Sequence, residues 1–160
     1  MKSFIDIHRY LIEDIASFMR KTHQTLSIAE SCTGGFLSSC FTSFPGASQY
    51  FSGSIISYSN QSKDLFLGVK QQYIDQYGAG SREVARMMVQ NVRDKYKTEW
   101  GLSTTGYVDA THDISSPYAW IAVSNKDYIN TRCVYLDQNR IKNIQVISLS
   151  ALELLKKEIR

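Results

Sequence analysis

Apolar side chains recur at intervals of three or four residues near both ends of the chain. The N-terminal set comprises Phe4, Ile7, Leu11, Ile15 and Phe18. The C-terminal set comprises Ile141, Ile144, Ile147, Ala151 and Leu155. Because this spacing gathers each set on one side of an α-helix, it predicts an amphipathic helix over residues 3–22 and a closing helix through 141–155.

Between these helices, short strand-like runs alternate with helical patterns. Runs rich in apolar, aromatic and β-branched residues predict strands at 25–29, 53–58, 100–105, 118–124 and 128–136. Helical or turn-like segments are predicted at 36–44, 65–69 and 73–77, and a polar loop at 109–116. Ser81 is a good N-cap for a further helix whose core face would carry Val84, Met88 and Val92.

This order of elements predicts an α/β fold in a single domain over residues 1–160. Helices and strands alternate through the first two thirds of the chain, and two adjacent strands and a helix end it. A chain of 160 residues can bury a substantial core. We therefore expect a three-layer α/β/α sandwich around a mixed, mostly parallel sheet with one antiparallel hairpin.

The amino-acid composition argues against nucleic acids and membranes as partners of this protein. Hydrophobic residues make up 43% of the chain and charged residues 21%, as in ordinary globular domains. The net charge of +3 is dispersed along the sequence, which argues against a nucleic-acid partner. No apolar run approaches the roughly 18 residues of a membrane span, and Asp6, Glu13 and Asp14 interrupt the N-terminal pattern, unlike a secretory signal. We expect a cytoplasmic protein with no membrane partner.

Cysteine and histidine positions predict neither a metal nor a cofactor. The cysteines are odd in number and lack CxxC spacing, at positions 32, 40 and 133. They therefore indicate neither a disulfide framework nor a zinc site, and a reducing cytoplasm is the simplest setting. The histidines, at positions 8, 23 and 112, share no metal-ligand spacing.

The motif Ala-Glu-Ser-Cys-Thr-Gly-Gly at 29–35 lies where a predicted strand passes into a helix. Ligands of open α/β sheets bind at the carboxyl ends of strands, and glycines there let the backbone approach them. Ser31 at such a turn is a candidate nucleophile, with nearby N–H groups as an oxyanion hole. The alternative is that Ser31 or Thr33 only caps the following helix.

The second polar motif, Ser-Tyr-Ser-Asn-Gln-Ser-Lys at 57–63, follows another predicted strand. Tyr58 and Lys63 would then reach the same sheet edge as Ser31. A lysine whose pKa is lowered by burial acts as the base in Ser–Lys hydrolases. The alternative is a packed Tyr58 and a solvated Lys63 in the first turn of a helix.

These motifs resemble the CinA C-terminal domain family, the nicotinamide-mononucleotide deamidases. The resemblance is carried by AESCTGG, then FPGASQYFSGSIISYSNQSKDLFLGV and YGAGSREVA, in the family's order from about residue 26 to 85. It continues more weakly through Ser103-Thr104-Thr105-Gly106, Pro117, Asn139-Arg140 and Ala151-Leu152.

The resemblance implies an α/β/α fold that hydrolyses the carboxamide of nicotinamide mononucleotide to nicotinate mononucleotide and ammonia, a step of pyridine-nucleotide salvage. Ser31 matches the family nucleophile, and Tyr58 and Lys63 match its activating partners. The substrate-binding residues that it implies are Glu30, Thr33, Gly34, Gly35, Asn60, Thr105, Gly106 and Arg140. A homodimer and a small nucleotide or amide substrate are further expectations from the resemblance.

One segment departs from the family. Where relatives carry a glycine-rich stretch similar to IAGPDGG, this chain reads Tyr-Val-Asp-Ala-Thr-His-Asp at 107–113. Glycines near a phosphate supply positive φ angles and a close backbone approach, which bulky residues cannot copy. Asp109 and Asp113 also add negative charge where the family is thought to receive a phosphate. We therefore expect weakened affinity for nicotinamide mononucleotide.

Two functions of different classes remain open on the sequence. The retained Ser31, Tyr58 and Lys63 favour an amidohydrolase with Ser31 as nucleophile. The replaced loop favours a catalytically impaired homologue that uses the fold as a binding or assembly module. A role in DNA uptake would rest on the competence-linked family name alone, and the charge pattern does not support it.

Overall fold

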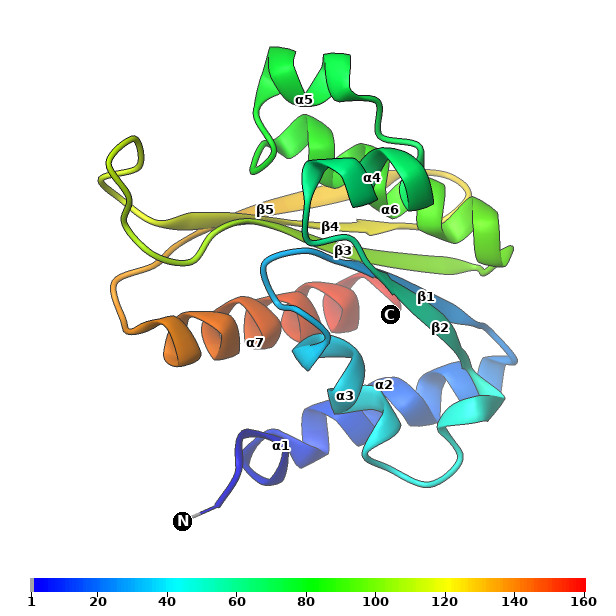
Figure 1. Ribbon diagram of the computed structural model, residues 1–160. Coiled ribbons are helices and arrows are strands. Elements are labelled where there is room, and N and C mark those ends of the chain that lie inside the picture. Colours follow the sequence, from blue (N-terminus) through cyan, green and yellow to red (C-terminus); the bar gives the residue numbers. More distant parts are fainter. Residues whose placement is uncertain (1) are drawn as a thin grey trace.

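The computed structural model describes residues 2–160 and places helices on both faces of a five-stranded sheet (Figure 1). The strands are β1 (Leu26–Glu30), β2 (Phe51–Ile56), β3 (Trp100–Tyr107), β4 (Tyr118–Ser124) and β5 (Ile129–Tyr135). The helices are α1 (Phe4–Ile7), α2 (Arg9–Thr22), α3 (Phe36–Thr42), α4 (Asn60–Leu67), α5 (Gln71–Tyr77), α6 (Arg82–Tyr96) and α7 (Arg140–Glu158), with a short 3-10 turn at Ala47–Gln49. The expected three-layer α/β/α sandwich is confirmed.

The sheet is mixed, with strand order β2-β1-β3-β4-β5. β1 pairs in parallel with β2 and β3, whereas β3 with β4 and β4 with β5 pair antiparallel. The β4–β5 hairpin is the predicted one. The parallel part is smaller than expected because the loop after β3 returns the chain directly to the edge of β3, with no crossover helix between the two strands.

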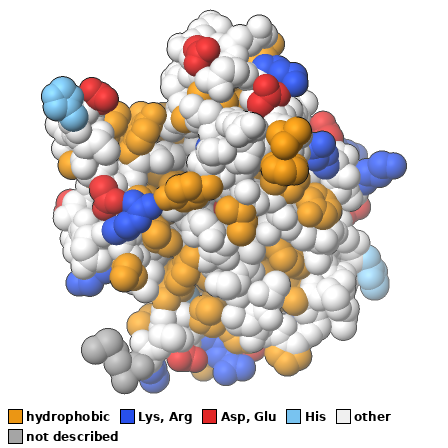
Figure 2. All heavy atoms as spheres, viewed as in Figure 1, with side chains coloured by type: hydrophobic (Ala, Val, Ile, Leu, Met, Phe, Trp, Pro, Cys, Tyr) orange, Lys and Arg blue, Asp and Glu red, His pale blue; other side chains and the backbone are white. Residues whose placement is uncertain are grey.

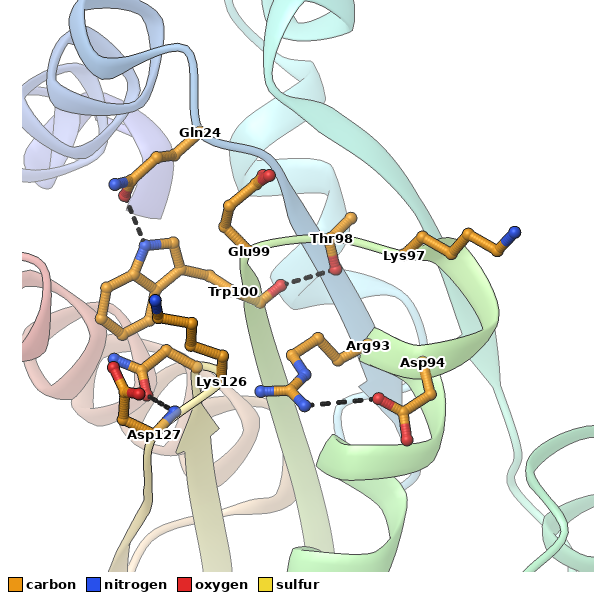
Figure 3. Close-up of a pocket in the computed structure, with 10 residues that line it drawn as sticks. Gln24, Arg93, Asp94, Lys97, Thr98, Glu99, Trp100, Lys126 and Asp127 are labelled. Atoms are coloured by element: carbon orange, nitrogen blue, oxygen red, sulfur yellow. Dashed lines mark hydrogen bonds and ion pairs between the residues drawn. The ribbon is translucent and has the colours of Figure 1, made fainter.

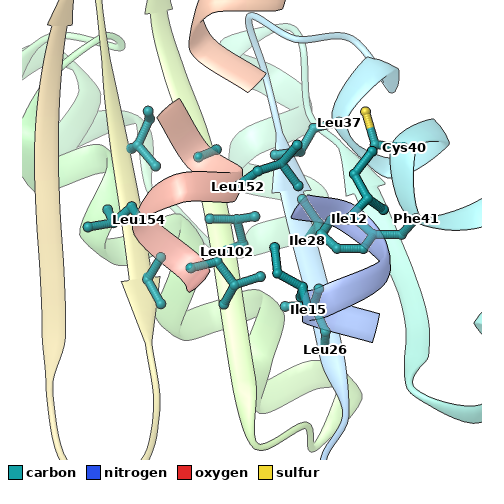
Figure 4. Packing of buried hydrophobic residues seen from close by; sticks show 14 of the residues in the cluster. Ile12, Ile15, Leu26, Ile28, Leu37, Cys40, Phe41, Leu102, Leu152 and Leu154 are labelled. Atoms are coloured by element: carbon teal, nitrogen blue, oxygen red, sulfur yellow. The ribbon is translucent and has the colours of Figure 1, made fainter. Parts of the chain in front are cut away.

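The main core lies between the sheet and α2, α3 and α7 (Figure 4). Side chains alternate along β1, so Leu26 and Ile28 enter this core while Ala29 faces α6 on the other side. Figure 4 shows the residues that meet here, among them Ile12, Ile15, Leu26, Ile28, Leu102 and Leu152. The alternation places the side chain of Glu30 on the α3 side of the sheet.

The second layer of helices covers the opposite face of the sheet. There α6 packs on the strands, and α4 and α5 pack against α6 (Figure 1). Ser81 is the N-cap of α6 and accepts a hydrogen bond from Val84 N at 3.2 Å. Val84, Met88 and Val92 are all fully buried. Both predictions for this helix are therefore confirmed.

Two predictions for the terminal helices need correction. The single helix expected over 3–22 is broken at His8 into α1 and α2, and Ile7 is exposed. Ile141 is also exposed. A helix turns about 100° per residue, so two successive three-residue steps place Ile141 about 120° around α7 from the buried Ile147.

Charges are mixed on the surface. Lys and Arg side chains are interspersed with Asp and Glu on the face that Figure 2 shows. No helix within residues 2–160 combines the length and the apolar character needed to cross a bilayer.

Candidate active site

A cleft of about 290 Å³ opens at the carboxyl ends of β1, β2 and β3. Ser31 directly follows β1, Tyr58 lies two residues after β2, and Thr105 is near the end of β3. All three line this cleft, as do Asn60, Lys63, Gly106 and Arg140. The prediction that the polar motifs meet at one sheet edge is confirmed, because the parallel strands end on the same side.

Ser31 and Lys63 are in direct contact. Lys63 Nζ lies 2.9 Å from Ser31 Oγ and donates a second hydrogen bond to the carbonyl oxygen of Ser57 at 3.0 Å. The two residues are almost fully buried, with exposed fractions of 6% for Ser31 and 2% for Lys63. A proton can pass between the two side chains without a bridging water.

The start of α4 fixes the position of Lys63. Ser59 is the N-cap and forms a capping box with Ser62, so the helix begins at Asn60 and directs Lys63 inward from its first turn. Burial lowers the pKa of the Lys63 amine. No carboxylate among residues 2–160 forms an ion pair with this amine, so little opposes the shift toward its neutral form.

Glu30 does not reach the cleft. Its buried carboxylate accepts hydrogen bonds from the backbone N–H groups of Gly35 (2.9 Å), Leu37 (3.2 Å) and Ser38 (2.8 Å), and from the Ser38 hydroxyl. These are orphan donors of the first turn of α3, and a carboxylate there also suits the helix dipole. Glu30 therefore holds the start of α3 and does not line the cleft, contrary to the substrate-binding position expected for it.

The capping alternative for Ser31 and Thr33 is wrong. The N-cap of α3 is Gly35, and neither hydroxyl caps the helix. The N–H groups at the start of α3 donate to the Glu30 carboxylate instead. The hydroxyl of Thr33 instead lies 2.7 Å from that of Thr104 on β3. The buried Thr33 thus links the turn at 31–35 to the sheet.

The two glycines shape the turn but do not offer free donors. Gly34 and Gly35 have φ angles of 58° and 98°, in the left-handed region that favours glycine. Gly34 N–H donates to the Ser31 carbonyl at 3.1 Å, and Gly35 N–H is held by Glu30. Within the described chain, Cys32 N–H and Thr33 N–H have no hydrogen-bond acceptor. Of the N–H groups on this turn, these two are therefore the ones available to an oxyanion.

Cys32 lines the cleft beside Ser31 but is almost fully buried. Burial raises the pKa of the Cys32 thiol to about 12. The thiolate, which is the reactive form, is therefore disfavoured at neutral pH, whereas the Ser31 hydroxyl has the Lys63 amine beside it.

At the mouth of the cleft, Tyr58 and Arg140 make a different set of contacts. Arg140 forms an ion pair with Asp109 and donates a hydrogen bond from Nη2 to Tyr58 Oη at 2.5 Å. Tyr58 is largely exposed, and in residues 2–160 its hydroxyl makes no hydrogen bond to Ser31 or Lys63. Asn60 is exposed at the same mouth.

Thr105 and Gly106, near the end of β3, also line the cleft. Thr105 Oγ1 donates to the Ala79 carbonyl at 2.7 Å, which ties β3 to the segment before α6. A Cβ atom at Gly106 would lie 2.3 Å from the Tyr118 carbonyl oxygen, so this glycine permits close packing of β3 on β4. Both residues border the cleft, but these contacts hold β3 against its neighbours in the fold.

Sequence reasoning missed two contributors to this site. The Ser57 carbonyl accepts from Lys63, and a main-chain contact leaves no side-chain signature. The sequence predicts for Asp109 only an unfavourable negative charge near a phosphate, whereas in the structure it pairs with Arg140 across 31 positions of sequence. Its place in the segment that departs from the family pattern was the available signal.

A larger hollow of about 480 Å³ lies at the opposite end of β3, around Trp100 (Figure 3). Trp100 Nε1 donates to Gln24 Oε1 at 2.7 Å, and the Thr98 hydroxyl donates to the Trp100 carbonyl at 2.9 Å. Three basic and three acidic side chains surround them. Among the residues that line this hollow, no serine, threonine or cysteine lies beside a basic group as Ser31 lies beside Lys63. The smaller cleft is therefore the better candidate for an active site. Across residues 2–160, no group of three or more His, Cys, Asp or Glu side chains could hold a metal ion.

The fold and the cleft define an α/β domain with a buried serine–lysine pair at the carboxyl edge of its sheet. The sequence model of the CinA C-terminal domain matches residues 8–159, and the chain belongs to this family. The CinA-like protein of Amoebophilus asiaticus is 39% identical over 153 residues, which cover 93% of this chain and 37% of that protein. The CinA-like protein of Cytophaga hutchinsonii is 33% identical over 149 residues, which cover 91% of this chain and 36% of that protein. The chain thus spans little more than a third of the length of these relatives.

Solved structures show the same fold at lower identity. The competence/damage inducible protein from Agrobacterium tumefaciens superposes with a TM-score of 0.90 at 22% identity, covering 100% of this chain and 98% of that one. The competence or damage-inducible protein from Enterobacter asburiae gives 0.90 at 19% identity, with both chains fully covered.

Proposed function

We propose that this domain is an amidohydrolase that cleaves a primary carboxamide with Ser31 as nucleophile and Lys63 as general base. The observation that carries the proposal is the 2.9 Å contact between Ser31 Oγ and the buried Lys63 amine, whose pKa is lowered and which no carboxylate in residues 2–160 neutralises. A buried neutral lysine next to a serine hydroxyl is the arrangement that makes serine nucleophilic.

In the acylation step, Ser31 Oγ forms a bond to the amide carbon while its proton passes to neutral Lys63. The carbonyl electrons move onto oxygen, where Cys32 N–H and Thr33 N–H are the available donors. The C–N bond then breaks, and the leaving nitrogen takes the proton from Lys63 and departs as ammonia. The product of this step is an ester on Ser31.

In the deacylation step, water attacks the ester carbon and gives a proton to Lys63. The bond to Ser31 Oγ breaks, and the serine oxygen recovers the proton from Lys63. The net reaction consumes one amide and one water and yields one carboxylic acid and ammonia. The Ser57 carbonyl, at 3.0 Å from Nζ, orients the amine throughout the cycle.

This mechanism assigns proton transfer to Lys63 alone. The Tyr58 hydroxyl is engaged with Arg140, so we assign Tyr58 to the mouth of the cleft rather than to the transfer that the family resemblance implies. The same resemblance makes a nicotinamide carboxamide the first substrate to test. It also implies nicotinate mononucleotide as the product when the substrate is nicotinamide mononucleotide.

The test is ammonia release by purified wild-type protein and Ser31→Ala. The substrates are nicotinamide mononucleotide, nicotinamide riboside, nicotinamide and a panel of aliphatic and aromatic primary amides. We expect release from at least one amide with wild type and none above background with the variant. Equal release by both proteins, or no release from any amide, would contradict the proposal. Ligand binding without turnover would favour the binding-module alternative.

A further inference from the structure

Three side chains from separate segments join at the mouth of the cleft. Arg140 is the first residue of α7, Asp109 belongs to the loop after β3, and Tyr58 follows β2. The guanidinium pairs with the Asp109 carboxylate and donates to the Tyr58 hydroxyl. In Figure 2, acidic, basic and hydrophobic side chains adjoin where this loop approaches the start of α7.

The backbone next to Asp109 is anchored. Asn143 of α7 is almost fully buried and donates from Nδ2 to the Val108 carbonyl at 2.7 Å and to the Gln138 carbonyl at 2.8 Å. Val108 is itself buried. Because Asp109 directly follows an anchored residue, its carboxylate is held beside the first turn of α7, where Arg140 lies.

This pairing changes what the cleft can attract. Of the described residues that line it, Lys63 and Arg140 are the basic ones and Asp109 is the carboxylate. Lys63 is committed to Ser31 and the Ser57 carbonyl, which leaves Arg140 as the cation for a ligand anion. Asp109 already neutralises Arg140.

A phosphate monoester, with close to two negative charges at neutral pH, would meet an unfavourable site here. To reach Arg140 it must displace the Asp109 carboxylate, and the displaced carboxylate then lies beside the phosphate as a like charge. A neutral or cationic ligand meets no such repulsion, and a pyridinium ring would find a carboxylate of opposite charge.

We propose that Asp109 is a specificity-determining residue that excludes phosphate from this cleft, so that the substrate class is a primary carboxamide without a phosphate group. The amide part of this statement rests on the proposed function. The exclusion of phosphate rests on the contacts of Asp109 and Arg140 alone.

The experiment uses nicotinamide riboside and nicotinamide mononucleotide, which differ only by the phosphate. Both are titrated calorimetrically into three proteins that cannot turn over: Ser31→Ala, Ser31→Ala/Asp109→Asn and Ser31→Ala/Asp113→Asn. Asp113 is the matched control, because its side chain is almost fully exposed in the same loop and pairs only with His112 among residues 2–160. The Asp109–Arg140 pair is half-exposed, so losing it should cost little stability.

With Ser31→Ala alone, we expect the riboside to bind at least about tenfold more tightly than the nucleotide. Asp109→Asn should reduce this ratio at least about tenfold, and by less at high salt because screening weakens exposed charges. Asp113→Asn should change it less than about twofold.

An unchanged ratio in Asp109→Asn, an equal shift in Asp113→Asn, or no binding of either ligand by any variant overturns the proposal. Turnover plays no part in these titrations, so their outcome is distinct from that of the ammonia assay. A protein that binds the riboside selectively and releases no ammonia would refute the proposed hydrolysis and leave the exclusion of phosphate standing.

Discussion

The two sides of the cleft differ in how their polar groups are held. On the β1 side, Ser31 and Lys63 are buried in mutual contact, and Glu30 and Thr33 behind them are fixed by five hydrogen bonds to the start of α3 and to Thr104. On the loop side, Asp109 and Arg140 are half-exposed, and the side chain of His112 is entirely exposed.

Buried polar groups must keep their partners, because a lost partner leaves an unsatisfied group in a low dielectric. Exposed groups exchange partners with water at little cost, and loops therefore vary more readily than the elements that they connect. The proposed nucleophile and base therefore lie in a part of the molecule that should tolerate substitution poorly, whereas Asp109, the proposed determinant of ligand choice, lies in a part that should tolerate it well.

The largest effect is expected from Ser31→Ala. Removing the nucleophile should lower kcat for any amide substrate by at least about 10⁴-fold, because the remaining groups cannot form the acyl-enzyme. The cost in folding free energy should stay within about 1–3 kcal/mol, the range for one lost buried hydrogen-bond partner. Ammonia release and urea denaturation measure the two quantities. Turnover within about tenfold of wild type would show that Ser31 is not the nucleophile.

Lys63→Met removes the base and preserves an unbranched side chain of similar length. We expect a loss in kcat of about 10²–10⁴-fold, the usual contribution of a positioned base. The wild-type rate should rise with pH and level off above the lowered pKa of Lys63, because only the neutral amine accepts the Ser31 proton. A pH–rate profile of both proteins tests this, and the same rising limb in Lys63→Met would assign it to another group.

The same lysine makes stability depend on pH. Its pKa is lower in the folded protein than the 10.5 of the unfolded chain, so the unfolded chain binds the proton more readily. The free energy of unfolding should therefore rise with pH between the folded value and about 10.5. Lys63→Met should lack this rise, and urea titrations of both proteins at several pH values give the difference. Parallel curves would mean that the amine is charged in the fold.

Glu30→Ala tests the buried side of the cleft through stability. Three backbone N–H groups of the α3 turn would lose their acceptor, at about 1–3 kcal/mol for each buried unsatisfied donor. We expect a loss of at least about 3 kcal/mol in the free energy of unfolding. Ser38→Ala, which removes one contact to the same carboxylate, should cost only about 1 kcal/mol. Similar losses in the two variants would mean that Glu30 does not hold the helix.

The smallest effect is expected from His112→Ala at the tip of the loop. The imidazole is fully exposed, and its pairing with Asp113 is equally exposed. The free energy of unfolding should change by no more than about 0.5 kcal/mol, as at most surface positions. A loss above about 1.5 kcal/mol, measured by the same denaturation, would show that the loop is held as firmly as the β1 side.

Much of the fold could be predicted because its signals are local. Ser81 and the apolar spacing specify α6 within a few residues of sequence, and the β-branched and aromatic residues of 128–136 do the same for β5. The break at His8 has no comparable signature, since the apolar spacing continues across it. The antiparallel pairing of β3 with β4 also depends on how a loop turns in space.

The site divides in the same way. Proximity of Ser31 and Lys63 followed from two motifs at the ends of parallel strands and from the family resemblance. The role of Glu30 required knowing which face of β1 it occupies, because both a ligand and a helix end lie within reach of that motif. The pairing of Asp109 with Arg140 depends on the docking of α7, which no short pattern encodes.

The hydrogen bonds of the turn at 31–35 also determine the rates at which its backbone amides exchange hydrogen with water. The Gly34 and Gly35 amides are held by the Ser31 carbonyl and the Glu30 carboxylate, so deuterium should enter them only when the turn opens. In residues 2–160, the amides of Cys32 and Thr33 have no acceptor to slow their exchange. The acyl oxygen of the proposed ester on Ser31 would provide an acceptor, so formation of this ester should slow deuterium uptake at these two amides.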